Sequence, residues 1–167
     1  MTELKTPVGP EDHSLGPEEA PITLLEYGDY QCPHCGHAYP IVKAVQEKLG
    51  NRLRFVFRNF PLREMHPMAE AAAESAEYAG SQGRFWEMHD LLFENQGRLS
   101  ESLLLELVQQ LRLDARDLQK SLREHSYLGR VQKEFASGVR SGVNGTPTFF
   151  INGSRHDGDF EIGRAHV

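Results

Sequence analysis

The spacing of apolar residues along the chain predicts three strands. Residues Ile22–Tyr27 are mostly apolar, which is typical of a buried strand. Over 52–59, apolar and basic residues alternate, so a second strand would place them on opposite sides of a sheet. A third strand is expected at Thr148–Ile151. It precedes Asn152-Gly153, a dipeptide that favours a hairpin turn.

In most of the remaining chain, apolar residues recur at the spacing of a helix. A first helix is expected from Cys32 to about Leu49, with Pro40 inside it as a source of a kink and Gly50 at its end. From about Pro67 onward the apolar residues again recur at helical intervals. We expect helices at 67–79, at 85–95, from Ser100 to Leu111, from Asp114 onward and at 126–139. In the last of these, one face should hold Leu128, Val131, Phe135 and Val139.

Both ends of the chain depart from these patterns. Residues 1–20 are polar and rich in proline, glycine and glutamate, and we expect a flexible lead before a single domain at 21–161. The final hexapeptide, 162–167, fits neither periodicity and matches one reading frame of a common sequencing adapter. We therefore expect that it is not native and that the natural chain is longer, and we leave it out of the fold prediction.

Charge and hydropathy exclude some function classes. The formal net charge is -6 and the isoelectric point is about 5.7, whereas a surface that binds nucleic acid is normally basic. No apolar run reaches the roughly 18 residues of a membrane-spanning helix. No cationic segment followed by an apolar one is visible at the start, so the cytoplasm is the expected location.

The candidate chemistry lies between the first strand and the first helix. The only two cysteines, Cys32 and Cys35, are separated by Pro33 and His34. A C-x-x-C at a strand-to-helix junction is typical of a thioredoxin-type redox site. One thiolate can attack a substrate disulfide, and the second thiol can resolve the mixed disulfide. A purely structural bridge would close a very small loop and stabilise little, so we favour catalysis by the Cys32–Cys35 pair without another cofactor.

A metal site is the alternative use of this cluster. His37 would have to join Cys32, His34 and Cys35 around one ion. These residues lie too close in sequence to close easily into a tetrahedral set, and no second C-x-x-C is present. We therefore expect no metal.

Two motifs together make the chain resemble the DsbA-like branch of the thioredoxin superfamily. They are Cys32-Pro33-His34-Cys35 and Gly145-Thr146-Pro147-Thr148, and the resemblance covers about residues 12–157. It implies an α/β thioredoxin fold with a helical insertion, at about 66–140, between the second and third strands. It also implies a C-terminal helix that this sequence lacks, so we expect that helix to be truncated.

The resemblance further implies a protein thiol–disulfide oxidoreductase. Its partners would be protein or peptide thiols and disulfides, with glutathione or a redox protein as candidate regenerating partners. Cys32 would be the nucleophile, because the start of a helix favours a thiolate, and His34 would add a nearby donor. A stabilised thiolate makes the disulfide oxidising, whereas the cytoplasm would keep the pair reduced, so the direction of exchange stays open.

Two further residues take roles from the same resemblance. Glu26, six residues before Cys32, would be a buried acid that accepts the proton of Cys35; the alternative is an ordinary acid at a strand edge. Pro147 would follow a cis peptide bond and bring the backbone of Thr146 beside Cys32, where a substrate peptide could pair with it. The alternative is a trans turn proline.

Two other functions remain open. One is a glutathione-dependent isomerase or transferase on the same fold, although such relatives generally lack a full C-x-x-C, so Cys35 argues against it. The other is a non-catalytic regulatory module, because some related domains are fused to membrane transporters. Loss of Cys32 without loss of function would favour the module.

Overall fold

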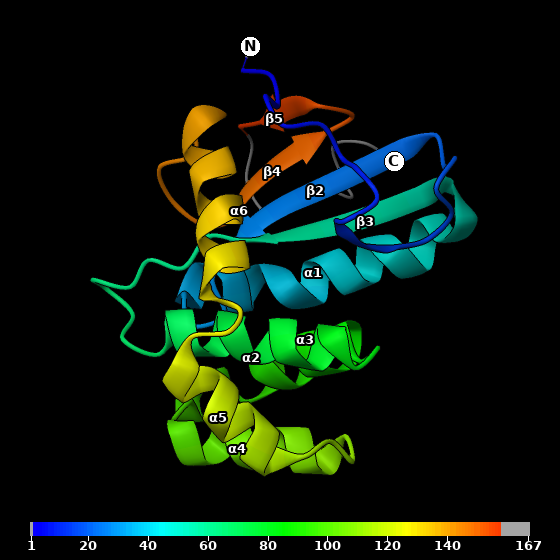
Figure 1. The fold of residues 1–167 in the computed structure, drawn as a ribbon. Coiled ribbons are helices and arrows are strands. Elements are labelled where there is room, and N and C mark those ends of the chain that lie inside the picture. Colours follow the sequence, from blue (N-terminus) through cyan, green and yellow to red (C-terminus); the bar gives the residue numbers. More distant parts are fainter. Residues whose placement is uncertain (1, 158–167) are drawn as a thin grey trace.

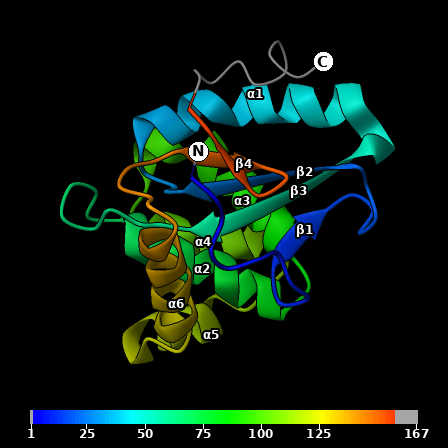
Figure 2. The ribbon, with the colours of Figure 1, turned by 90° about the horizontal axis from the view of Figure 1, so that it is seen from above.

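The computed structural model describes residues 2–157, which form a five-stranded sheet with helices on both faces (Figures 1 and 2). β2 and β3 run parallel, and the other neighbouring pairs are antiparallel. The spatial order is β1-β3-β2-β4-β5. The strands are β1 (His13–Leu15), β2 (Ile22–Gly28), β3 (Leu53–Asn59), β4 (Thr148–Ile151) and β5 (Ser154–His156).

A block of helices separates β3 from β4, which confirms the predicted α/β fold class with its helical insertion. The first helix, α1, connects β2 to β3 and ends at a short 3-10 turn, η1 (Gly50–Arg52). A second such turn, η2 (Gln96–Arg98), lies within the block. The helices are α1 (Pro33–Leu49), α2 (Ala69–Ser81), α3 (Phe85–Glu94), α4 (Glu101–Gln110), α5 (Ala115–Glu124) and α6 (Leu128–Arg140). None of these described helices is both long and apolar enough to cross a membrane.

Local sequence signals set several of the helix ends. The Ser100 hydroxyl accepts a hydrogen bond from the Leu103 N–H at the start of α4. The Asp114 carboxylate accepts from the N–H groups of Arg116 and Asp117 at the start of α5. Gly50 ends α1 with a φ of 52°, a left-handed value that glycine adopts without strain. The helix ends expected from the sequence at Gly50, Ser100 and Asp114 are therefore confirmed.

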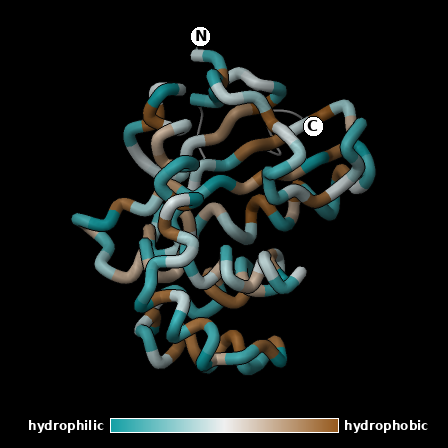
Figure 3. Tube along the Cα trace, in the orientation of Figure 1, coloured by the Kyte–Doolittle hydropathy of each residue, from teal (hydrophilic) through white to brown (hydrophobic). Residues whose placement is uncertain are grey.

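Alternation along the strands builds two apolar clusters, one on each face of the sheet. Leu24 and Phe55 point to the face covered by α1, where the cluster continues into α2–α5. Leu25 and Val56 point to the opposite face and pack with Phe135 of α6. Figure 3 shows the resulting hydrophobic stretches, in brown, running through the middle of the sheet. Both faces of the central strands are therefore buried, and α1 and α6 are fixed on opposite sides.

The N-terminal segment differs from the flexible lead that we predicted. Residues 13–15 form β1, which pairs with β3. The buried Arg58 side chain, which reaches this segment from β3, binds the Asp12 carboxylate at 2.8 Å and the carbonyl oxygens of Thr6 and Pro7. Residues 6–15 are held to the sheet by the pairing of β1 and by the partners that Thr6, Pro7 and Asp12 supply to the buried guanidinium.

The buried face of α6 also differs from the prediction. Val139 is exposed, and Gly138 takes the inward position. A β-carbon at Gly138 would lie only 2.8 Å from the Phe60 ring, so the close packing of α6 on this ring requires a residue without a side chain. The expected non-native hexapeptide at 162–167 and the truncated C-terminal helix lie outside the described residues.

Candidate active site

Cys32 lies between β2 and α1, at the end of a turn formed by residues 29–32. It is the N-cap of α1, with an extended backbone (φ -71°, ψ 122°), and Pro33 follows in the first helical turn. Its N–H donates to the carbonyl oxygen and to the carboxylate of Asp29, both at 3.2 Å. Pro33 and His34 are exposed, whereas Cys32 is 4% exposed and Cys35 is fully buried; both cysteines are free thiols. The pair thus sits at the positive end of a 17-residue helix.

The surroundings of Cys32 favour its thiolate. The pKa of Cys32 is lowered to about 5, chiefly because the Cys35 thiol donates a hydrogen bond to it. The Thr146 side chain and the N–H groups of Cys35 and His34 act in the same direction, and burial opposes them. The Thr146 carbonyl oxygen lies 3.5 Å from Sγ and accepts from the protonated thiol, a contact that opposes ionisation. Because these hydrogen-bond donors outweigh burial and the Thr146 carbonyl group, the thiolate form of Cys32 is favoured. Cys32 is therefore the more reactive sulfur at neutral pH.

Cys35 has the opposite character. Burial raises the pKa of Cys35 well above its usual value, and the hydrogen bond that it donates to Cys32 and the negative charge of Glu26 add to this. One N–H, that of Asp29, points at its sulfur from 3.5 Å and partly offsets the increase. The site therefore holds one sulfur as a thiolate and keeps a proton on the other.

Glu26 lies on the central strand β2, between β3 and β4, and is 3% exposed. The alternative of an ordinary acid at a strand edge is therefore wrong. Burial raises the pKa of Glu26 to about 8, with a smaller contribution from the charge of Cys32. Its Oε2 atom has no hydrogen-bond partner among residues 2–157. A carboxyl group with this pKa, whose charge acts on Cys35, can take up or release a proton near neutral pH.

The loop before β4 completes the site from the other side. The Thr146–Pro147 peptide bond is cis. Thr146, whose carbonyl oxygen contacts Cys32, is half-buried. Among the described residues, no three histidine, cysteine or acidic side chains are grouped so that they could hold a metal ion. The structure thus brings together the predicted residues Cys32, Cys35 and Thr146 by direct contact.

Asp29 was missed by sequence reasoning. Its buried carboxylate accepts hydrogen bonds from the N–H groups of Gln31 at 2.7 Å and Cys32 at 3.2 Å through one oxygen. The other oxygen binds the Leu62 N–H at 2.9 Å and the His66 ring at 2.8 Å. An aspartate that binds the N–H two residues ahead is a common turn device, and that local signal could have identified it. The contacts to Leu62 and His66 are long-range and leave no local signal.

Gln96, of η2, is a second residue that the sequence did not reveal. Its side-chain amide donates to the carbonyl oxygens of Tyr30 at 2.9 Å and Cys32 at 2.7 Å. It reaches the active-site turn from the helical insertion, 64 residues further along the chain than Cys32. No spacing rule connects residues at that separation.

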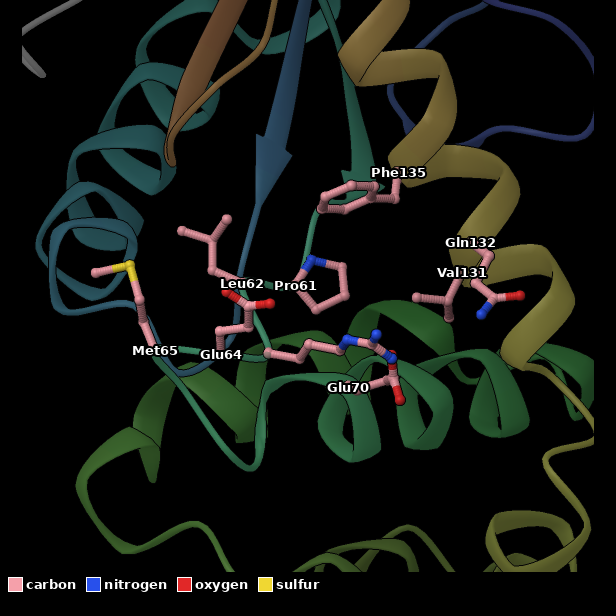
Figure 4. A pocket seen from close by; sticks show the side chains of 9 residues that line it. Pro61, Leu62, Glu64, Met65, Glu70, Val131, Gln132 and Phe135 are labelled. Carbon is pink, nitrogen blue, oxygen red and sulfur yellow. The ribbon is translucent and has the colours of Figure 1, made fainter.

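A groove of about 480 Å³ lies beside this site, between residues 61–65, α2 and α6 (Figure 4). Neither cysteine lines it. The wall of the groove that contains Leu62 is linked to the active-site turn, because the Leu62 N–H donates a hydrogen bond to the Asp29 carboxylate. Met65, on the same wall, is 72% exposed. The lining residues are Pro61, Leu62, Arg63, Glu64, Met65, Glu70, Val131, Gln132 and Phe135.

Comparison with known proteins identifies the family. The family model described as thioredoxin matches residues 9–163, so the chain belongs to the thioredoxin family. A thioredoxin-like oxidoreductase from Silicibacter pomeroyi DSS-3 is 25% identical, with a TM-score of 0.76 over 94% of this chain and 93% of that one.

Two solved structures with lower sequence identity share the fold. BdbD from Bacillus subtilis, in its oxidised form, gives a TM-score of 0.81 at 24% identity, over 91% of this chain and 89% of that one. Alpha-DsbA1 from Wolbachia pipientis gives 0.82 at 21% identity, over 97% and 90%. The predicted resemblance to DsbA-like proteins is thereby confirmed at the level of the fold.

Curated relatives with higher sequence identity are named as Na(+)/H(+) antiporters. Na(+)/H(+) antiporter NhaA 1 from Salinispora arenicola is 45% identical over 163 residues, which are 97% of this chain but 25% of that protein. Na(+)/H(+) antiporter NhaA 3 from Salinispora tropica is 44% identical with the same coverage. The chain spans about a quarter of the length of these relatives.

Proposed function

We propose that the protein is a thiol–disulfide oxidoreductase that exchanges disulfides with protein or peptide substrates through Cys32 and Cys35. One observation carries this proposal: two neighbouring thiols at the start of α1 have pKa values displaced in opposite directions. A dithiol site needs this asymmetry, because one sulfur must attack as a thiolate while the other stays protonated until the mixed disulfide has formed.

In the reducing direction, the Cys32 thiolate attacks one sulfur of a substrate disulfide. A Cys32–substrate disulfide forms, and the other substrate sulfur leaves as a thiolate. Cys35 then gives its proton to Glu26 and attacks Cys32 Sγ, which forms the Cys32–Cys35 disulfide and releases the second substrate thiolate. Two electrons pass from the enzyme to the substrate. The reverse sequence oxidises a substrate dithiol.

The cis-proline loop supports the proposed substrate position. The Thr146 carbonyl oxygen lies 3.5 Å from Cys32 Sγ, so a peptide whose cysteine reaches Cys32 passes beside the Thr146 backbone. We propose that it pairs with this backbone as an added strand. His34, exposed in the first turn of α1, would contact the same peptide.

Two opposing effects act on the direction of exchange, which stays open. A thiolate as stable as that of Cys32 favours the reduced enzyme, which makes the disulfide form a strong oxidant. In a reducing compartment such as the cytoplasm, the glutathione pool would hold the pair reduced, and reduction or isomerisation would prevail. Glutathione or a redox protein would then regenerate the site.

Reduction of insulin disulfides by dithiothreitol, followed by turbidity, tests the proposal. The wild-type protein should accelerate the reaction, and Cys32→Ser should abolish the acceleration. Gln110→Ala, at an exposed position on α4, serves as a matched control and should be as active as wild type. A wild-type protein that does not exceed the dithiothreitol background would contradict the proposal. If that protein nevertheless bound glutathione, the glutathione-dependent alternative would be favoured.

The antiporter relatives favour a second candidate, a regulatory module, because 97% of this chain aligns with part of a transporter. In that case the domain would act by binding, and Cys32 and Cys35 would not turn over a substrate. A Cys32→Ser/Cys35→Ser double variant that retained its effect in cells would show that the module acts without any thiol chemistry.

A further inference from the structure

The Cys32 backbone is held from two sides. Its N–H is bound by Asp29, as described above. Its carbonyl oxygen accepts two hydrogen bonds: one from the Gly36 N–H at 3.0 Å, within α1, and one from the Gln96 amide at 2.7 Å. Gln96 also binds the carbonyl oxygen of Tyr30 at 2.9 Å. One side chain of the helical insertion thus binds the carbonyls on either side of residue 31.

Gly36 provides a second, independent observation. A β-carbon built at this position would overlap the Gln96 amide, with only 2.8 Å to its Cδ atom. Glycine inside a helix is less favourable than alanine, so helix formation alone gives no reason for it here. Its absent side chain makes the space that the Gln96 amide occupies.

We propose that Gln96 is a positioning residue that fixes the Cys32 turn so that Sγ faces the donors at the start of α1. This inference rests on the proposed exchange function, because it concerns the same nucleophile. Gln96 acts through the Cys32 carbonyl group and not through a hydrogen bond to the sulfur.

The consequence for Cys32 is electrostatic. The thiolate depends on hydrogen bonds from Cys35 and on the N–H groups of His34 and Cys35, and these contacts require a fixed orientation of the turn. Without the Gln96 amide, the turn can rotate about its backbone bonds and these donors lose alignment. The thiol form then becomes more populated at a given pH. A residue that only attached the insertion to the sheet would change stability and leave this ionisation unaltered.

The rate of iodoacetamide alkylation of the reduced protein, measured from pH 4 to pH 8, tests the proposal, with the modified residue assigned by mass spectrometry. Alkylation requires no substrate protein and no turnover, so a failure here is distinct from a failure of the oxidoreductase proposal, which the insulin assay on wild type detects. The variants are Gln96→Ala, Gly36→Ala and their combination, with Gln110→Ala as the control. Circular dichroism verifies that each variant is folded.

The expected midpoint for Cys32 is near pH 5 in wild type and in Gln110→Ala. Gln96→Ala should raise it by about one pH unit, because a net hydrogen bond and a tenfold change in ionisation are of similar size. Gly36→Ala should shift it in the same direction, because the added methyl group displaces the amide. In the Gln96→Ala background, Gly36→Ala should add nothing.

Two results would overturn the proposal. One is a Gln96→Ala midpoint equal to that of wild type. The other is a Gly36→Ala shift that is just as large in the absence of Gln96, since the shift would then arise from Gly36 alone.

Discussion

Replacing Glu134 with glutamine should make the protein more stable above neutral pH. Glu134, on α6, is buried against two elements. From β3, the N–H and the side-chain amide of Asn59 donate to its Oε1 at 2.8 and 2.9 Å. Glu77 of α2 shares that amide at 2.9 Å and is bound by His13 of β1. Arg130 of α6 forms ion pairs with both carboxylates, at 2.6 Å with Glu77 and 3.5 Å with Glu134.

The magnitude follows from the ionisation of Glu134. Burial, and then the charge of Glu77, raises the pKa of Glu134 from 4.5 to about 7. A difference of about 2.5 pH units between the unfolded and folded states corresponds to about 3 kcal/mol. Because the folded-state pKa is the higher one, the folded protein holds a proton that the unfolded chain has already released. This contribution to the free energy of unfolding is therefore complete below about pH 4.5 and is lost as the pH rises through 7.

Urea unfolding of reduced wild type and Glu134→Gln, followed by circular dichroism between pH 4.5 and pH 8.5, measures this effect. The two proteins should be equally stable near pH 4.5, because both carry a neutral group at position 134. At pH 8.5 the variant should be more stable by up to about 3 kcal/mol. Glu106→Gln, at an exposed position on α4, should follow wild type throughout. A difference between wild type and Glu134→Gln that does not change with pH would refute the reasoning.

Three further predictions follow from the site and its supports. Glu26→Gln should remove the inflection near pH 8 from the pH profile of thiol exchange, because the proton acceptor for Cys35 is lost; an unchanged profile would show that Glu26 has no such role. Asp12→Ala should lower the free energy of unfolding by about 3 kcal/mol, since it leaves Arg58 buried without its carboxylate, and a loss below 1 kcal/mol in urea unfolding would contradict this. Ser100→Ala should cost about 1 kcal/mol in the same assay through the lost cap of α4, whereas Ser102→Ala should cost less.

Local sequence patterns predicted those helices and strands whose ends are set by residues close to them in the chain. β2, α1 and the caps at Ser100 and Asp114 belong to this group. β1 was missed because His13–Leu15 is short and largely polar, and it is a strand only through its pairing with β3. The same holds for the segment before it, which is ordered by the buried Arg58. The error at Val139 has a tertiary cause as well, because the Phe60 ring selects Gly138 for the inward position.

In the active site, too, some residues could be predicted from the local sequence and others could not. Cys32 and Cys35 are neighbours in sequence, and their chemistry follows from a short motif at the start of a helix. The burial that raises the pKa of Glu26 comes from packing between β3 and β4, which the sequence suggested only through resemblance. Asp29 and Gln96 support the same turn from within and from the helical insertion. Their partners lie far along the chain, so the fold had to be known before their roles were visible.

The most direct test of the central claim is to trap the mixed disulfide. Cys35→Ser protein, mixed at pH 7 with a peptide that contains one disulfide, should form a covalent adduct on Cys32, and mass spectrometry should locate it there. Cys32→Ser protein, treated in the same way, should form none, because Cys35 is buried and protonated. An adduct on Cys35 at a comparable rate, or none on Cys32, would contradict the assignment of Cys32 as the nucleophile.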